Sequence, residues 1–176
     1  MEPESILVEN LRIVLNRIER YMVLGIGSSL FMVLLANAAP ELVKTGEGVE
    51  IPGVFLATDP GLAATVVLAV YWIAGFMASY TVSRAERIVE ALTKSPDILE
   101  AALTYPSIAT TRIHGPRIGA ALLPPVLLIV TLLIEGGWPE SYNSVFGFFI
   151  FAAPYIVLAF QLRLPIGGYK PDKFGD

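Results

Sequence analysis

Four long stretches of the chain carry no charged residue, and this feature constrains the fold more than any other. They cover residues 21–39, 61–82, 118–134 and 144–162 of a 176-residue chain. A helix needs roughly 20 apolar residues to cross a bilayer core of about 30 Å. The stretches are continuously apolar rather than alternating, which argues against the strands of a membrane β-barrel. We therefore predict an all-α integral membrane protein with four transmembrane helices.

The composition agrees with this class and narrows the function. Hydrophobic residues make up 55% of the chain and charged residues 16%, whereas a soluble domain carries about 25% charged residues. The net charge is −4 and no basic run exists, so we expect no nucleic-acid partner. Cys is absent and His occurs once, which argues against thiolate chemistry and transition-metal sites. We expect no metal and no cofactor.

The basic residues predict the orientation. All but one of the 12 Lys and Arg residues fall on one side of a four-span arrangement, and the exception is Lys44. The basic side holds Arg12, Arg17, Arg20, Arg84, Arg87, Lys94, Arg112, Arg117, Arg163, Lys170 and Lys173. Because positive residues stay inside, we predict that this side is the cytoplasm, with both termini there. The expected location is a plasma (inner) membrane.

Residues 1–20 are predicted to form an N-terminal amphipathic helix. Its apolar residues recur at spacings of three and four, which places them on one face; they are Ile6, Leu7, Leu11, Val14, Leu15 and Ile18. Two interpretations remain open. The helix lies in the cytoplasmic interface before turning into the first span, or it packs on a neighbouring subunit.

Residues 83–117 are predicted to form a short helical connection in the cytoplasm. The second span should continue to Leu92, and a new helix should start at Ser95-Pro96-Asp97, with Ser95 as its cap. It should end near Tyr105-Pro106. A layer of this size is too small for an independent enzyme domain.

The remaining segments are two outer loops and a tail. In the loop at 40–60 the apolar content favours a short hairpin or a segment on the outer interface, and an external ligand surface is the alternative. The loop at 135–143 is short and contains no basic residue. The tail at 163–176 is expected to be an irregular cytoplasmic strap.

Small residues lie four apart in the first two spans. The pairs are Gly25 with Ser29 and Gly75 with Ser79, and such spacing lets helix backbones approach closely. These residues are our candidates for helix packing, either within the bundle or between subunits. Pro residues interrupt the third and fourth spans, and they indicate either kinks that line a pore or ordinary bundle kinks.

A second candidate site is the segment that precedes the third span. Arg112, His114 and Arg117 are a candidate contact for a lipid headgroup or another anion. The alternative interpretation, which we favour, is positive-inside flanking next to a turn.

Chemistry within the membrane usually requires ionisable groups in the spans, and all four spans lack them. The motifs of membrane metalloproteases and serine hydrolases are also absent. These features disfavour ion-coupled transport. They also disfavour a lipid-modifying enzyme, which is the third interpretation after the two given next. We expect a non-enzymatic packing or sensing subunit of a homo- or hetero-oligomeric membrane assembly. Its partners would be the lipid bilayer and other membrane subunits or copies of itself. The alternative is a small oligomeric channel whose kinked third and fourth spans line a pore.

Overall fold

The structure, a computed structural model, describes residues 3–45, 48–50, 57–104, 106–111, 113–134, 142–163 and 166. Within these ranges the protein is helical apart from one pair of very short strands. The elements in chain order are α1 (Pro3–Thr45), β1 (Val49–Glu50), β2 (Ala57–Thr58), α2 (Pro60–Leu92), α3 (Pro96–Leu103), α4 (His114–Ile134) and α5 (Tyr142–Gln161).

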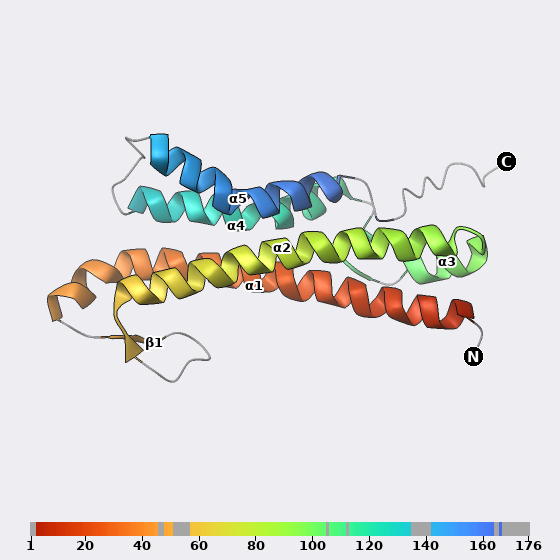
Figure 1. Cartoon of the computed structure of the whole chain (residues 1–176), viewed down its shortest axis with the longest axis horizontal. Coiled ribbons are helices and arrows are strands. Elements are labelled where there is room, and N and C mark those ends of the chain that lie inside the picture. Colours follow the sequence, from red (N-terminus) through yellow and green to blue (C-terminus); the bar gives the residue numbers. More distant parts are fainter. Residues whose placement is uncertain are drawn as a thin grey trace.

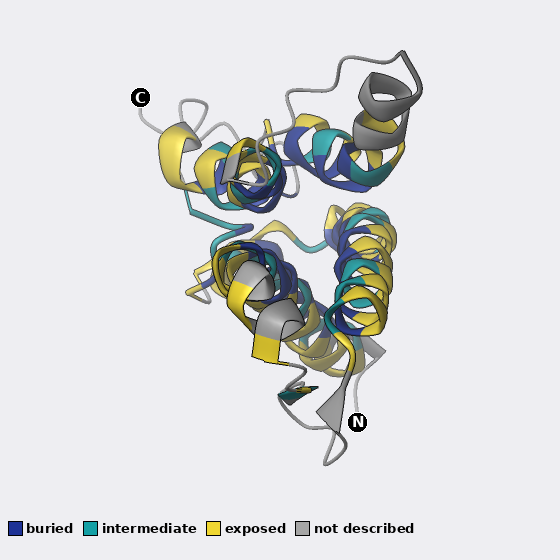
Figure 2. Ribbon diagram, turned by 90° about the vertical axis from the view of Figure 1, so that its left-hand side faces the viewer, coloured by how far each residue is buried: buried dark blue, intermediate teal, exposed yellow. Residues whose placement is uncertain are grey.

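Four of the helices form an antiparallel bundle made of two pairs. The long helices α1 and α2 lie side by side, and the shorter pair α4 and α5 covers part of their length (Figure 1). Helix α1 packs against α2 and α4, while α5 packs against α2 and α4. Viewed end on, the four helices occupy the corners of a square, with buried residues facing inward and exposed residues outward (Figure 2).

Helix α1 corrects one expectation about the amphipathic segment. Residues 3–20 and the first span form one continuous helix of 43 residues, about 65 Å long at 1.5 Å per residue, with no turn between them. No Pro interrupts this stretch, and a single stripe of buried residues runs along it, including Leu11, Ile18 and Met22. This face packs on helices of its own chain, which neither of the two interpretations above anticipated.

Three helices are long and apolar enough to cross a membrane. Within the described residues they are Ser5–Ala38, Pro60–Leu92 and Gly115–Leu133, whereas the corresponding apolar part of α5 is shorter, Phe149–Gln161. The all-α membrane class is therefore supported by three of the four expected spans.

Large apolar side chains are exposed on the outer faces of all four bundle helices. They include Leu34 on α1, Phe76 on α2, Val126 on α4 and Phe160 on α5. Exposed Arg residues begin where this apolar belt ends, as at Arg20 on α1 and at Arg84 on α2. We call the section beyond the belt the α3 end: residues 3–20 of α1, residues 81–92 of α2, and α3.

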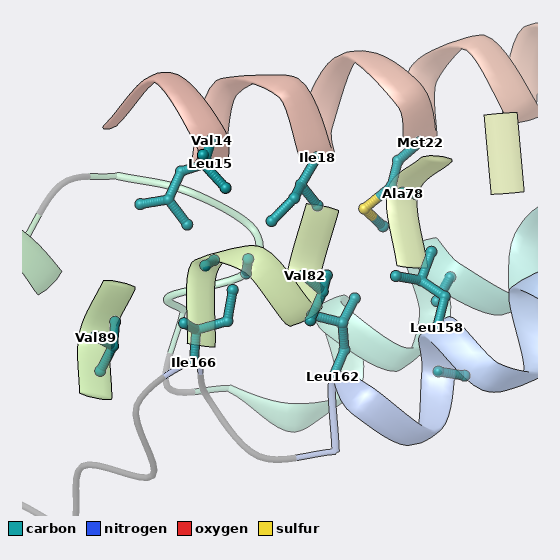
Figure 3. Close-up of a cluster of buried hydrophobic side chains, with 14 of the residues drawn as sticks. Val14, Leu15, Ile18, Met22, Ala78, Val82, Val89, Leu158, Leu162 and Ile166 are labelled. Atoms are coloured by element: carbon teal, nitrogen blue, oxygen red, sulfur yellow. The ribbon is translucent and has the colours of Figure 1, made fainter. Parts of the chain in front are cut away.

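The α3 end holds one part of the main apolar core, which continues through the middle of the bundle to Tyr71 and Tyr155. Side chains from α1, α2 and the residues that follow α5 meet at the α3 end and are buried (Figure 3). The set includes Val14, Leu15, Ile18, Val82, Val89, Leu162 and Ile166. Helix α3 adds Leu99 and Ala102 to the same cluster.

The local signals for helix ends explain most of the observed boundaries. Asp59 caps α2 by accepting a hydrogen bond from the backbone N–H of Leu62 at 3.0 Å, and Pro60 follows it. Helix α2 runs to Leu92 and α3 ends at Leu103, as the sequence predicts. Ser95 occupies the N-cap position of α3, as predicted, although its side chain makes no capping hydrogen bond there.

The loop at 40–60 contains a minimal antiparallel strand pair. Val49 pairs with Thr58 and Glu50 with Ala57, in agreement with the hairpin interpretation. The pair lies at the end of the molecule opposite α3 (Figure 1).

Candidate helix-packing site

The middle of the bundle is filled by the side chain of Tyr155 from α5. Its ring lies directly against Gly25 of α1 and Gly75 of α2, so that a Cβ atom on either glycine would collide with it; at Gly75 the nearest ring carbon would be only 2.6 Å away. Tyr155 is fully buried. The two glycines therefore make room for an aromatic side chain from a third helix, not only for each other's backbones.

Hydrogen bonding and ring contact fix the position of Tyr155. Its hydroxyl donates to the backbone carbonyl of Tyr71 at 2.9 Å, which satisfies a polar group that would otherwise be costly to bury. The rings of Tyr71 and Tyr155 are 4.8 Å apart between centroids and tilted by 37°, a geometry that aromatic pairs favour. We call Gly25, Gly75, Tyr71 and Tyr155 the tyrosine lock.

A short chain of polar side chains joins α2 to α5 where the middle of the bundle meets the α3 end. Ser79 donates to the side-chain oxygen of Gln161 at 2.8 Å, and the Gln161 amide donates to the hydroxyl of Ser83 at 2.9 Å. Hydrogen bonds between helices are a recognised means of holding membrane bundles together. Ser79 is thus in contact with another helix. Its partner, Gln161, could not be identified from the spacing of Gly75 and Ser79 in the sequence.

Ser29, the fourth candidate for helix packing, is also buried. Its hydroxyl donates to the carbonyl of Gly25 in the preceding turn at 2.8 Å. Its polar atom is thereby satisfied within α1, which allows a small side chain to face the bundle without requiring a partner from another helix.

The candidate anion contact is only partly visible. Arg112 and the side chain of His114 lie outside the described residues. Arg117 is fully buried at the start of α4 and donates to the backbone carbonyl of Arg163, just beyond α5, at 3.3 Å. In this position the guanidinium links the start of α4 to the end of α5.

The loop after α3 is tied to α1 by a charged side chain. The carboxylate of Glu19 accepts a hydrogen bond from the backbone N–H of Ile108 at 2.9 Å. Beside it lies an open hollow of about 540 Å³, lined partly by the hydroxyl-bearing residues Thr104, Ser107, Thr110 and Thr111. Glu19 thus positions the connection between α3 and α4.

Tyr155 and Gln161 are packing residues that were not predicted from the sequence. A signal for both exists, because a Tyr or Gln inside a charge-free span must find a hydrogen-bond partner when it is buried. The partners themselves lie about eighty residues away along the chain and are not readable from local spacing.

Across the described ranges, no group of three or more His, Asp or Glu side chains lies close enough to hold a metal ion. No family model, no curated protein and no solved structure matches the chain.

Proposed function

We propose that the chain is a non-enzymatic membrane protein that acts as a packing or sensing subunit of a homo- or hetero-oligomeric assembly. The observation that carries this proposal is the tyrosine lock. The centre of the bundle, where a solute path or a reaction site within a single chain would have to lie, holds an aromatic ring that fits between two glycines. An interior of this kind favours helix association over transport or catalysis.

We also propose that α5 is the fourth span and that the α3 end lies in the cytoplasm. The antiparallel order of the helices brings the start of α1, the end of α2, the start of α4 and the end of α5 to the same end of the bundle (Figure 1). Most of the Lys and Arg residues belong to the segments at that end of the bundle, and positive residues favour the cytoplasmic side. Labelling with an impermeant amine reagent should reach Lys44 from outside the cell but not Lys94, and labelling of both from one side would contradict four spans.

The outer face of α2 is the surface that we propose for contact with a neighbouring chain. Trp72, Phe76 and Tyr80 follow each other one turn apart and are all exposed, and the rings of Trp72 and Phe76 stack with centroids 5.9 Å apart. Aromatic side chains of this kind are enriched among the residues that contribute most to protein contacts.

A comparison of two exposed Phe residues tests this contact. Phe76→Ala should shift the native particle, purified in mild detergent, to a lower mass. Phe149→Ala removes an equally large exposed side chain from α5 and should leave the mass unchanged. If the wild-type chain purifies alone as a monomer, or if both variants behave alike, the assembly role or the proposed face is wrong.

The channel alternative makes a different prediction. The side chains of Pro124, Pro125 and Pro154 are buried within the single bundle, so the kinked spans turn these residues away from a pore between copies. Protein reconstituted in liposomes should therefore conduct no ions. Ion flux from the purified chain, altered by Thr131→Val on α4, would replace the packing role with a channel.

A further inference from the structure

Two hollows adjoin along α1, one in the apolar belt and one at the edge of the charged α3 end, and we call the two together the groove. Its apolar part has a volume of about 570 Å³ and lies between α1 and α2, where Gly27, Phe31 and Leu34 face Val66 and Val70. All five residues belong to helices that are apolar enough to span a membrane. Lipid tails are therefore the surrounding medium at this part of the groove.

The groove continues into a polar hollow of about 520 Å³. Asn16, Glu19 and Arg20 line this hollow, and Val23 and Leu24 line both it and the apolar part. From Arg20 to Leu34 the helix rises about 21 Å, close to half the thickness of a bilayer of about 40–45 Å including its headgroups. The groove thus has a polar section next to an apolar section, as a lipid has a polar headgroup next to its apolar tails.

Charge at the polar section favours a phosphate group. Arg20 is exposed and lines the hollow, whereas the carboxylate of Glu19 accepts a hydrogen bond from the loop after α3. The cation lies where the apolar belt ends, which is the depth of lipid phosphates if the helices span the membrane. Basic residues at this depth attract anionic headgroups.

We propose that this groove binds one phospholipid, with its phosphate at Arg20 and an acyl chain along Gly27, Phe31 and Leu34. A transmembrane helix from another chain would match the apolar section alone, because an apolar helix offers no anionic group at the level of Arg20. The proposal does not depend on the subunit role proposed above, since a monomer would present the same groove.

Two glycines with open space make a matched test of the apolar section. A Cβ atom on Gly27 of α1 or on Gly119 of α4 would meet no other atom within 4 Å, so both Gly27→Leu and Gly119→Leu should fold. Only Gly27→Leu fills the groove. For the polar section, Arg20→Gln removes the cation at the hollow, and Arg17→Gln removes a charge from the same helix outside it.

The measurement is the number of lipids retained per chain. The full-length protein is reconstituted in phosphatidylglycerol vesicles, extracted in mild detergent, washed, and analysed by native mass spectrometry. Wild type, Gly119→Leu and Arg17→Gln should each retain one phospholipid, whereas Gly27→Leu and Arg20→Gln should lose it about fivefold more readily.

Two results would overturn the proposal. One is equal lipid retention by Gly27→Leu and Gly119→Leu. The other is a lower particle mass in Gly27→Leu with unchanged lipid content, which would mean that another chain occupies the groove. Circular dichroism shows whether each variant keeps its helicity. A variant that has lost helicity is replaced by the smaller change Gly27→Ala or Arg20→Lys, and the same criteria apply to it.

Discussion

The apolar middle of the bundle and the α3 end hold the same helices together by different means. In the middle, glycines of α1 and α2 meet the buried ring of Tyr155, and polar side chains link α2 to α5. At the α3 end, branched and other large apolar side chains from α1, α2 and α5 fill a conventional core (Figure 3). Helices α1 and α2 pass through both environments without a break.

The difference is the one expected if the middle lies in lipid and the α3 end in water, as proposed above. In lipid, burying an apolar side chain gains little, so close backbone approach and hydrogen bonds stabilise the contact. In water, each apolar side chain removed from solvent contributes about 1.5–3 kcal/mol. If the α3 end projects from the membrane, substitutions that remove apolar volume should be costly there, and substitutions that add volume should be costly in the middle.

The largest expected effect is that of Leu11→Asp at the α3 end. Leu11 is fully buried, and a carboxylate in its place would lie in an apolar core without a partner. We expect a loss of more than about 4 kcal/mol in the free energy of unfolding, with weaker membrane retention of the native particle. Denaturation in mild detergent measures it. The neighbouring exposed charge change, Glu9→Gln, should have almost no effect, and equal tolerance of both would show that this core does not drive packing.

Gly75→Leu should produce the next largest effect, this time by adding volume in the middle. The new side chain would occupy the place of the Tyr155 ring, which lies 2.6 Å from a Cβ on this residue. Overpacking of this kind costs about 3 kcal/mol, so the discrete particle in mild detergent should be lost. Gly119→Leu is the control, because its Cβ has open space. A stable Gly75→Leu particle would mean that the glycine is not needed for close packing.

A smaller effect is expected for Tyr155→Phe, which keeps the ring and removes the hydroxyl that donates to Tyr71. Losing one such hydrogen bond costs about 1 kcal/mol, which should lower the unfolding temperature without changing the particle mass. A loss as large as that of Gly75→Leu would show that the hydrogen bond, rather than the fit of the ring, holds the bundle together.

Much of the helical framework was predictable from the sequence because its signals are local. The charge-free runs located three helices that can span a membrane, and Pro60, Pro96 and Pro106 lie at helix boundaries. The turn after residue 20, which belonged to one of the two open interpretations, does not occur, because a change from amphipathic to apolar pattern does not require a break in the backbone. Only a residue that disrupts hydrogen bonding forces one.

The packing site was predictable only in part. Small residues at Gly25 and Gly75 indicate close approach, but the sequence does not reveal which side chain fills the space. Arg117 illustrates the same limit. Positive flanking residues are expected to reach water or headgroups, yet this one is buried against the end of α5. Both outcomes depend on contacts between segments distant in the chain.

Helix α5 lies on α2 and closes the middle of the bundle, and a cross-link in native membranes tests this arrangement. The chain contains no Cys, so cysteines introduced in pairs are the only thiols. A short bifunctional thiol reagent should join Ser79→Cys to Gln161→Cys within one chain, because these side chains are 2.8 Å apart. It should not join Ser79→Cys to Phe160→Cys, since Phe160 is exposed on the outer side of α5. Equal cross-linking of both pairs, or none of the first, would contradict the account.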